Sequence, residues 1–493
     1  MVSIVHSAAM CGIQPILVDV EVDVNNQGLP YTKIIGLPGK VVQESRDRIK
    51  SALKNSGFTL RARKTTINLS PISLPKEHAT VDLAIAVGIL QSYGKLLKWE
   101  HMACFGEIAL DGSLRSVKGG YALAKLLIEH NITSLIFPKD QEQELTFCLP
   151  SSIKFFPVKN IAEVCNCFFK KIPSAISKPR QIAEIKIPTT LLQNPFLLHI
   201  LEICISGGHH ALFAGPLGTG KTTLAQTAKF LLPRLSSQER KEVAYQCSLA
   251  GKSSFAELGN RPFCEIHPHI PVTDLIGSSA KKIVGKIVLA NTGILFADEL
   301  PLFDQHIQEH MLSILDHQQI QLTTMVGLFE LPSCFTLIAT ANLCNCGFLE
   351  SKRKRCACSQ AEIERYQRKM LPALVDRIPI KVGINEIEQE IQPQKEDACS
   401  MKERIITARN IQGKRYGKIL LNGQASPQVF LSQCSFSTEA RMFMQKASLQ
   451  YRFSKRKTMQ IMQVAQTIAD LSFSQQTQIP HIAEAIQLNK ELW

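Results

Sequence analysis

The chain lacks any run of about 18 uninterrupted apolar residues, the length that an α-helix needs to cross a bilayer. Aromatic residues make up only 6% of it, and it contains neither a short internal repeat nor a long low-complexity tract. The first 24 residues also lack a basic region followed by an unbroken apolar segment, which is the pattern of a secretory signal. We therefore expect a cytoplasmic protein with no membrane partner.

Cysteine and positive charge, by contrast, are plentiful. Fifteen cysteines without a secretory signal indicate a reducing compartment rather than a disulfide scaffold. Lys and Arg number 56 against 42 Asp and Glu, a net charge of +14, which favours a polyanionic partner such as nucleic acid. The same excess is compatible with solubility alone. At 493 residues, 45% of them apolar, the chain is long enough for two to four globular domains.

The order of strand and helix patterns divides the chain into three domains of α/β and helical character. Residues 1–172 alternate strands with helices, and residues 173–190, rich in Pro, Ser, Lys and Ile, resemble a linker. A second α/β domain is expected over 191–384. A polar stretch, 385–400, then leads to a helical part over 401–493. The fold class is thus α/β with a helical C-terminal addition.

Periodicity locates the main elements. In the first domain it predicts strands over 16–24, 65–69 and 134–137 and helices over 41–56, 81–91 and 120–130. The strand over 16–24 alternates apolar residues with Asp19, Glu21 and Asp23, so one of its faces should be solvated. Apolar residues at helical spacing also predict a helix over 458–471.

The most specific motif is a phosphate-binding loop over residues 215–222, called the phosphate loop below. Its residues are Gly215, Pro216, Leu217, Gly218, Thr219, Gly220, Lys221 and Thr222, between an apolar run and a helix-forming run. Glycines let backbone N–H groups turn toward phosphate oxygens, and the helix N-terminus adds its positive dipole end. Lys221 would reach the β- and γ-phosphates of ATP, and the Thr222 hydroxyl would bind Mg²⁺. The alternative, a glycine turn before an ordinary helix, does not account for the full pattern and its flanks.

An acidic pair follows a second apolar run. Residues 294–297 are apolar and lead into Asp298 and Glu299, as expected for a buried parallel strand that delivers carboxylates to its C-terminal end. Asp298 would hold Mg²⁺ through water, and Glu299 would orient and deprotonate the attacking water. Taken alone, the two acids could equally cap a helix. After a phosphate loop, the pair predicts an ATPase.

Four cysteines form two close pairs, Cys344 with Cys346 and Cys356 with Cys358. Such pairs, separated by a short loop, can hold one structural Zn²⁺ tetrahedrally. The alternative is four small hydrophobic residues in a cysteine-rich chain. The basic run 352–355 lies between the pairs, and it could be a solvated face or a phosphate contact.

Further short motifs occur along the chain. They include Gly36-Leu37-Pro38, Leu74-Pro75-Lys76-Glu77, Gly207-Gly208-His209, Arg261-Pro262-Phe263 and Thr467-Ile468-Ala469-Asp470-Leu471. With these motifs the chain resembles, along essentially its whole length, the magnesium-chelatase-like AAA+ ATPases of the YifB/ComM type. The resemblance implies a Lon-protease-like (ribosomal S5 domain 2-like) N-terminal domain, an AAA+ P-loop core with a parallel sheet, and a helical lid.

The resemblance also implies roles for residues outside the two nucleotide motifs. Asn342 matches the first sensor, which positions water near the γ-phosphate. Arg377 matches an arginine finger that reaches a neighbouring subunit's ATP, and Arg456 matches the second sensor of the lid. Without that resemblance, Asn342 could cap a turn, and both arginines could be surface charges.

The function implied is that of an ATP- and Mg²⁺-dependent homohexameric ring motor acting on DNA, as a helicase that drives branch migration during DNA uptake and recombination. A magnesium-chelatase motor subunit and a nucleotide-dependent scaffold are the alternatives. The fused N-terminal domain disfavours the first, and the Asp298–Glu299 pair disfavours the second. The chain departs from the family pattern at several positions, among them Leu217, which replaces a proline, and Lys286, which replaces a glutamate. Lys286 and the run 352–355 are the candidates for contacting DNA near a central pore.

The resemblance to Lon-type proteases, compared residue by residue, predicts an N-terminal domain without proteolytic activity. Alignment on Lys76-Glu77 and on residues 106–112 puts Thr80 where the protease has its serine and Tyr121 where it has its lysine. A phenol with a pKa near 10 is a poor substitute for a desolvated amine as general base. Lys118 and Lys125 lie about one turn either side of Tyr121, so a relocated base is conceivable.

Overall fold

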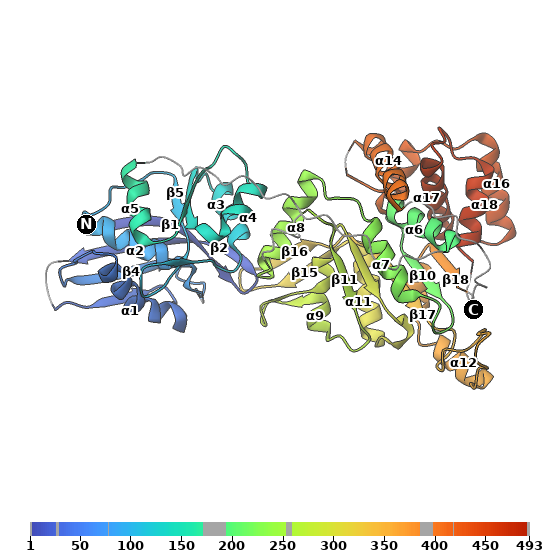
Figure 1. Cartoon of the computed structure of the whole chain (residues 1–493), viewed down its shortest axis with the longest axis horizontal. Coiled ribbons are helices and arrows are strands. Elements are labelled where there is room, and N and C mark those ends of the chain that lie inside the picture. The colour runs from blue at the N-terminus through green and yellow to red at the C-terminus, as the bar shows by residue number, and fades with distance from the viewer. Residues whose placement is uncertain are drawn as a thin grey trace.

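The computed structural model describes residues 2–25, 29–76, 78–170, 194–252, 259–384, 398–417 and 419–490. Figure 1 shows the N-terminal part at one end of the long axis, the C-terminal helices at the other, and the central part between them. The expected linker 173–190 lies outside the described residues, and so does most of the expected linker 385–400.

The N-terminal part is built on a seven-stranded mixed sheet of order β3-β4-β2-β1-β5-β8-β9. Its strands are β1 (Val2–Cys11), β2 (Gln14–Asn25), β3 (Thr32–Ile35), β4 (Lys64–Ser70), β5 (Met102–Cys104), β8 (Ser134–Pro138) and β9 (Lys154–Val158), and β6 (Glu107–Ile108) and β7 (Leu114–Arg115) form a separate ribbon. Its helices are α1 (Lys40–Asn55), η1 (Ala79–Val81), α2 (Asp82–Ser92), α3 (Gly120–Glu129), η2 (Lys139–Gln141), α4 (Glu142–Cys148) and α5 (Ile161–Lys170). The three predicted strands correspond to β2, β4 and β8, and the three predicted helices to α1, α2 and α3.

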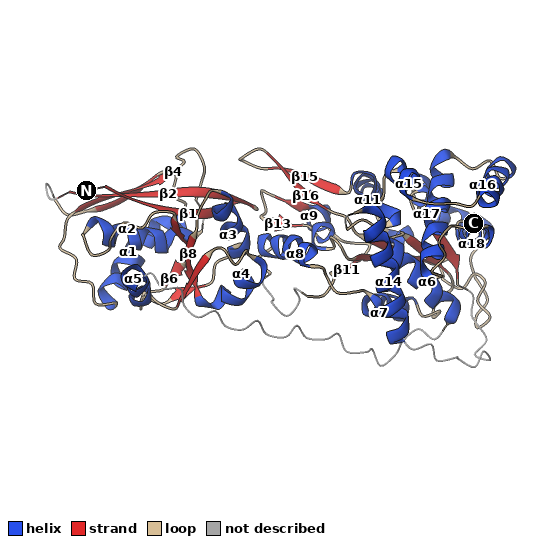
Figure 2. Cartoon of the chain, turned by 90° about the horizontal axis from the view of Figure 1, so that it is seen from above, coloured by secondary structure: helices blue, strands red, loops and turns tan. Residues whose placement is uncertain are grey.

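The predicted solvated face of β2 is confirmed. Along this strand Val18, Val20 and Val22 are buried, whereas the acidic residues between them are at least partly exposed. Figure 2 shows α1, α2 and α5 on one side of the layer formed by β1, β2 and β4. The valines therefore face the helices, and the acids face outward.

The central part contains a five-stranded, all-parallel sheet of order β11-β14-β17-β10-β18. The strands are β10 (Ala211–Ala214), β11 (Phe263–Ile266), β14 (Ile294–Ala297), β17 (Thr336–Ala341) and β18 (Ile380–Gly383). The helices are α6 (Pro195–Gly207), α7 (Lys221–Leu231), α8 (Ser237–Leu249), α9 (Val272–Ile276), α10 (Lys286–Leu289), η4 (Leu300–Leu302), α11 (Gln305–His317), α12 (Gln360–Gln367) and α13 (Pro372–Asp376). Two hairpins, β12 (Gly277–Ser278) with β13 (Ile283–Val284) and β15 (Gln319–Thr323) with β16 (Leu328–Pro332), extend from it.

The strand order fixes where ligands of this sheet should bind. The first strand, β10, lies inside the sheet, and the chain then continues to β11 at the far edge. It returns through β14 and β17 before β18 pairs with the other side of β10. Open parallel sheets bind ligands at the carboxyl ends of their strands, where such an order reverses. That position is the end of β10.

The C-terminal part is helical, as expected. It consists of α14 (Ala398–Tyr416), η5 (Asn422–Gln424), α15 (Pro427–Gln433), α16 (Thr438–Gln450), α17 (Lys455–Leu471) and α18 (Ile479–Leu488). The predicted helix over 458–471 forms the greater part of α17. The first described residues of α14, 398–400, fall within the segment 385–400 that was expected to be a linker.

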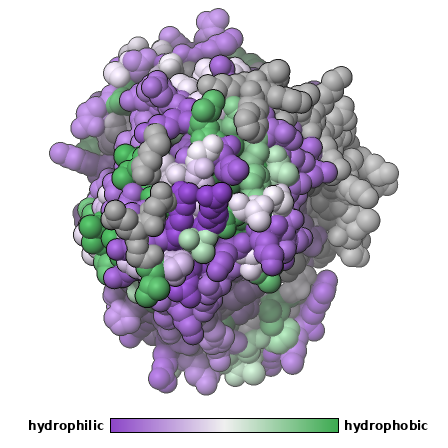
Figure 3. All heavy atoms as spheres, turned by 90° about the vertical axis from the view of Figure 1, so that its left-hand side faces the viewer, coloured by the Kyte–Doolittle hydropathy of each residue, from purple (hydrophilic) through white to green (hydrophobic). Residues whose placement is uncertain are grey.

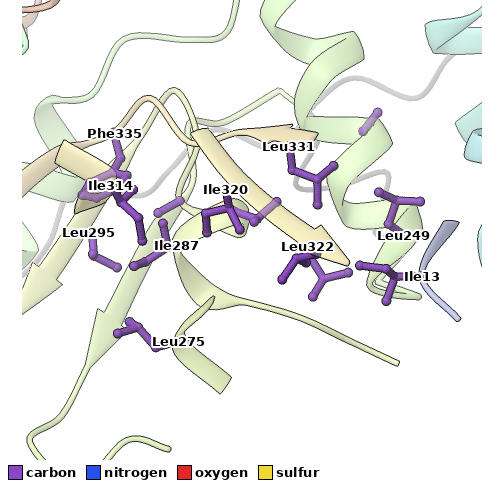
Figure 4. Packing of buried hydrophobic residues seen from close by; sticks show 14 of the residues in the cluster. Ile13, Leu249, Leu275, Ile287, Leu295, Ile314, Ile320, Leu322, Leu331 and Phe335 are labelled. Atoms are coloured by element: carbon purple, nitrogen blue, oxygen red, sulfur yellow. The ribbon is translucent and has the colours of Figure 1, made fainter. Parts of the chain in front are cut away.

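Apolar packing joins the N-terminal and central parts. Ile13 of the N-terminal part, Leu249 of α8 and Leu331 of β16 are buried in one cluster, which Figure 4 shows continuing toward the parallel sheet. At the same contact the Ser248 hydroxyl accepts the backbone N–H groups of Tyr121 at 3.0 Å and Ala122 at 3.2 Å. These groups are among the N–H donors that the first turn of α3 cannot satisfy internally. The central part therefore caps a helix of the N-terminal part.

Within the described ranges, every helix is too short or too polar to traverse a membrane. The end of the molecule formed by the N-terminal part presents mainly hydrophilic side chains, with hydrophobic ones scattered between them (Figure 3).

Candidate nucleotide-binding site

The phosphate loop joins β10 to α7, as the sequence predicts. Gly218 and Gly220 adopt positive φ angles of 83° and 86°, a region that glycine enters without steric cost. The Thr219 hydroxyl donates a hydrogen bond of 2.9 Å to the Pro216 carbonyl across the loop. The helix then begins at Lys221 with no acidic residue in its first turn. Its N-terminal amides and dipole therefore suit an anion such as phosphate.

Neighbouring strands bring the other predicted residues to the same edge. β17 pairs in parallel with β14 on one side and with β10 on the other. Asp298 and Glu299 follow β14 directly, and Asn342 follows β17. The carboxyl ends of the three adjacent strands therefore place the acidic pair and the amide beside the phosphate loop.

Lys221, Asn342 and Glu299 form one hydrogen-bonded chain. The Lys221 ammonium donates to the Asn342 side-chain oxygen and, at 3.3 Å each, to the Gly215 and Ala341 carbonyls. Asn342 in turn donates through Nδ2 to Glu299 Oε1 at 2.7 Å. Burial lowers the pKa of Lys221, while the charges of Glu299 and Asp298 oppose that change. The site thus connects a cation to a carboxylate through an amide.

Thr340 fixes the two acids, and sequence reasoning missed it. Its fully buried hydroxyl donates to Asp298 Oδ1 at 2.5 Å and accepts the backbone N–H of Glu299 at 3.0 Å. Glu299 has φ 55° and ψ 55°, a left-handed conformation that is unfavourable for a residue with a side chain. The Thr340 contact thus holds Glu299 in a strained geometry next to Asp298. The sequence feature that could have identified Thr340 is a hydroxyl residue inside an apolar strand, two residues before Asn342.

Tyr366 of α12 is a second residue that the sequence did not single out. Its ring is buried, and burial raises the pKa of its phenol, with the charge of Glu299 acting in the same direction. Next to it, Gln367 donates through Nε2 to the Leu343 carbonyl at 3.3 Å. These contacts pack α12 against the segment that follows β17.

The residues at this edge fit Mg²⁺ and phosphate. Carboxylate and hydroxyl oxygens are the ligands that Mg²⁺ prefers, and Asp298 supplies one such group. Thr222 lies in the first turn of α7, but its side chain is outside the described part of the structure. For phosphate, the loop offers a lysine and the amides of a helix N-terminus.

Arg377 and Arg456 form a separate group around Asp316, near the end of α11. Arg377 binds this carboxylate in a bidentate manner, with Nε to Oδ1 at 3.0 Å and Nη2 to Oδ2 at 2.8 Å. Arg456, in the first turn of α17, lies 3.8 Å from the same Oδ1. The hydrogen bond from Arg377 lowers the pKa of Asp316. Among the described residues, the hydrogen bonds of these two arginines do not extend to Lys221.

The four cysteines of residues 344–358, called the cysteine loop below, converge as the sequence predicts. All four Sγ atoms lie within 4.8 Å of one another, and the closest contacts are 3.4, 3.5 and 3.7 Å. Four sulfurs at about 2.3 Å from a tetrahedral Zn²⁺ would be about 3.8 Å apart. Backbone N–H groups of Phe348 and Ala357 lower the pKa of Cys346 to about 6, whereas contacts with Cys346 and Cys344 raise the pKa values of Cys356 and Cys358. The cluster therefore fits one zinc ion.

The basic residues proposed for DNA lie in two different places. Residues 352–355 are exposed on the cysteine loop, and Arg353 Nη1 is 3.7 Å from the position that a Cβ on Gly218 would take. This part of the run is therefore next to the phosphate loop. Lys286, at the start of α10, donates to the Glu265 carbonyl at 2.7 Å.

The residues aligned with a protease dyad are inaccessible. Thr80 of η1 and Tyr121 of α3 are each only 2% exposed, and burial raises the pKa of the Tyr121 phenol. The two lysines near Tyr121 are engaged with the central part. Lys118 donates to the Lys282 carbonyl at 3.4 Å, and the Lys125 ammonium lies 4.5 Å from the centre of the Tyr245 ring.

Comparison with known proteins identifies the family. Three family models match successive parts of the chain: "Subunit ChlI of Mg-chelatase" over residues 20–141, "Magnesium chelatase, subunit ChlI" over 196–392, and "Magnesium chelatase, subunit ChlI C-terminal" over 395–489. The uncharacterized protein YifB of Escherichia coli (strain K12) is 32% identical over 500 aligned positions, which cover 98% of this chain and 96% of the relative. The chain belongs to the magnesium-chelatase-like YifB/ComM family.

Other members of the YifB/ComM family match over the same extent. The competence protein ComM of Haemophilus influenzae is 31% identical, with 98% of this chain and 96% of the relative covered. The uncharacterized protein Rv2897c of Mycobacterium tuberculosis is 28% identical, with 98% of each chain covered. The ChlI subunits to which this family is related are AAA+ ATPases, which agrees with a phosphate loop at the end of β10.

Proposed function

We propose that this protein binds and hydrolyses ATP as an AAA+ motor. The observation that carries the proposal is the continuous contact from Lys221 through Asn342 to Glu299, with Thr340 holding Glu299 beside Asp298. A phosphate-binding lysine, a water-positioning amide and a candidate general base thus share one edge of the sheet. An ordinary turn and an ordinary helix cap would not produce this arrangement.

Each group then has a distinct role. The loop amides and Lys221 bind phosphate oxygens, and Asn342 orients the Glu299 carboxylate toward the attacking water. Glu299 accepts the proton of that water. Asp298 and Thr222 hold Mg²⁺, which neutralises charge on the phosphates when it is bound.

We further propose that the active form is a homohexameric ring. Arg377 and Arg456 converge on Asp316, and neither is hydrogen-bonded within the described part of the site around Lys221. In the proposed ring, Arg377 faces the ATP of the neighbouring subunit and stabilises charge there during hydrolysis, and Arg456 acts as the second sensor of the lid. Asp316 keeps Arg377 oriented through its bidentate contact.

DNA is the proposed substrate of the motor. The net charge of +14 supports it, and so does the name of the relative ComM, a competence protein. Lys286 is the proposed contact to the phosphate backbone. In this proposal the C-terminal helices act as the lid, and the Lon-like N-terminal part serves assembly or substrate contact without proteolysis. The cysteine loop holds one structural Zn²⁺, for which its thiol geometry is suited.

The test is ATP turnover by the full chain, measured alone and with single-stranded, duplex or branched DNA. We expect Mg²⁺-dependent turnover that at least one DNA form stimulates. DNA affinity should fall with salt, with a log–log slope of about 0.9 per duplex phosphate contacted.

Lys286→Ala should weaken binding to all sequences alike and lower that slope by about 1, whereas Lys446→Ala, at an exposed position of α16, serves as the matched charge control. ATP turnover that is indifferent to every DNA form, together with salt-independent affinity, would exclude the DNA motor. Absence of turnover under all conditions would exclude the ATPase itself.

A further inference from the structure

A direct contact joins the cysteine loop to the phosphate loop. The backbone N–H of Leu217 donates to the Gly347 carbonyl at 2.8 Å. Gly347 has φ +75°, and a Cβ built on it would lie only 2.5 Å from the Leu217 side chain. The two loops therefore touch through a backbone hydrogen bond and through an apolar contact that leaves no room for a methyl group.

The cysteines determine where Gly347 lies. Cys344 is buried two residues after Asn342. Its carbonyl accepts the Gly347 N–H at 3.1 Å. Cys346 precedes Gly347, and its Sγ lies within 3.4 Å and 3.5 Å of Cys344 Sγ and Cys356 Sγ. A metal bound by these sulfurs would therefore fix the turn that presents the Gly347 carbonyl to the phosphate loop. Without metal, the described contacts that hold the turn are its backbone hydrogen bond from Gly347 to Cys344, the Leu349 N–H bond to Cys344 Sγ at 3.4 Å, and weak S–H contacts between the cysteines.

Leucine at position 217 makes this link possible. Proline has no backbone N–H and could not donate to Gly347. This chain carries leucine where the family pattern has proline, so its phosphate loop has a donor that a proline-containing loop lacks.

We propose that the cysteine loop is a metal-dependent positioning element for the phosphate loop, so that zinc binding by Cys344, Cys346, Cys356 and Cys358 raises nucleotide affinity through the Leu217–Gly347 contact. This inference rests on the proposed ATP-binding function. Bound zinc would then control how tightly the nucleotide site binds ATP, in addition to stabilising the cysteine loop. Loss of the neutral hydrogen bond between Leu217 and Gly347, and of the order that it gives the phosphate loop, corresponds to a change of about three- to tenfold in nucleotide affinity.

The experiment measures zinc per chain and the affinity for a fluorescent, non-hydrolysable ATP analogue, using the full-length protein. Three states of the wild type are compared: as purified, after chelation, and after zinc is added back. We expect about one zinc per chain, a three- to tenfold loss of affinity on chelation, and recovery on addition of zinc. Recovery distinguishes a local effect from irreversible unfolding.

Variants separate the metal from the contact. Cys356→Ser with Cys358→Ser should lose zinc and weaken nucleotide binding, whereas Cys399→Ser, an exposed cysteine outside the cluster, should change neither. Gly347→Ala should keep its zinc and still bind the analogue more weakly, because the methyl group displaces Leu217. Leu217→Pro should retain zinc but lose most of its response to chelation, since the donor is gone.

The outcomes discriminate clearly between the two proposals. A wild-type protein that binds no ATP analogue in any state would refute the proposed nucleotide site. A wild type that binds the analogue equally well with and without zinc would overturn only the positioning role. So would a Leu217→Pro variant that responds to chelation as strongly as the wild type. A wild type that takes up no zinc would overturn both the positioning role and the zinc site, while the nucleotide site would stand. If the double serine variant does not fold, the chelation series and Gly347→Ala still decide.

Discussion

Replacement of Thr340 by valine should separate ATP hydrolysis from ATP binding. Valine has nearly the shape of threonine but lacks the hydroxyl that joins Asp298 to the Glu299 backbone. The contact to the carboxylate is a hydrogen bond to a charged group, worth about 1.5–3 kcal/mol. If that energy is expressed fully in the transition state, the turnover rate falls by about 10- to 150-fold. Lys221 and the phosphate loop are untouched, so affinity for ATP should change little.

The assay is steady-state ATP hydrolysis at varied ATP and Mg²⁺, with direct nucleotide binding in parallel. Thr340→Val should lower kcat while KM stays nearly constant, and its Mg²⁺ requirement should rise because Asp298 loses its positioning partner. Thr340→Ser, which keeps the hydroxyl, is the matched control and should retain most of the activity. A Thr340→Val variant with wild-type kcat at low Mg²⁺ would refute the reasoning.

Three further results are expected. Arg377→Ala should lower ATP turnover on the order of 10³-fold. Mixing Arg377→Ala subunits with Glu299→Gln subunits should restore part of the activity, because an intact Glu299 then meets an intact Arg377 of the neighbouring subunit. If mixing restores no activity, Arg377 does not act in trans. Burial raises the pKa of Glu144 from 4.5 to about 7, so between these values the unfolded carboxyl ionises first and the wild type loses stability as the pH rises. Glu144→Gln should therefore be more stable than wild type by up to about 3 kcal/mol at pH 8 but nearly equal below pH 4.5, and an equal difference at both pH values in thermal unfolding would contradict this. Finally, an unfolded protein substrate incubated with the chain and ATP should stay intact, whereas degradation that Thr80→Ala abolishes would reveal a protease.

The sequence predicted most of the element order because its periodicities are strong. The alternation over 16–24 and the helical spacing over 458–471 both reappear, with β2 and α17 extending a few residues beyond the predicted ends. Element ends depend on caps and pairing partners that periodicity does not encode. Residues 398–400, expected to be linker, already belong to α14.

At the site, the sequence predicted those residues that belong to contiguous motifs. Lys221 and Glu299 stand in recognisable local patterns, and the parallel sheet brings them to one edge. Thr340, Asp316 and Gly347 could not be predicted in the same way, because each acts through a partner remote in sequence. A threonine in a strand is ordinary by composition, and only the pairing of β14 with β17 reveals what its hydroxyl contacts.

The most direct test of the ATPase assignment compares wild type, Lys221→Ala and Glu299→Gln for ATP binding and phosphate release in the presence of Mg²⁺. We expect that wild type binds ATP and releases phosphate and that Lys221→Ala loses ATP binding. Glu299→Gln should bind ATP normally but release phosphate at least about 100-fold more slowly, because an amide of the same shape cannot accept the proton. Phosphate release at the wild-type rate by Glu299→Gln would contradict the role of Glu299 as general base and, with it, the ATPase assignment.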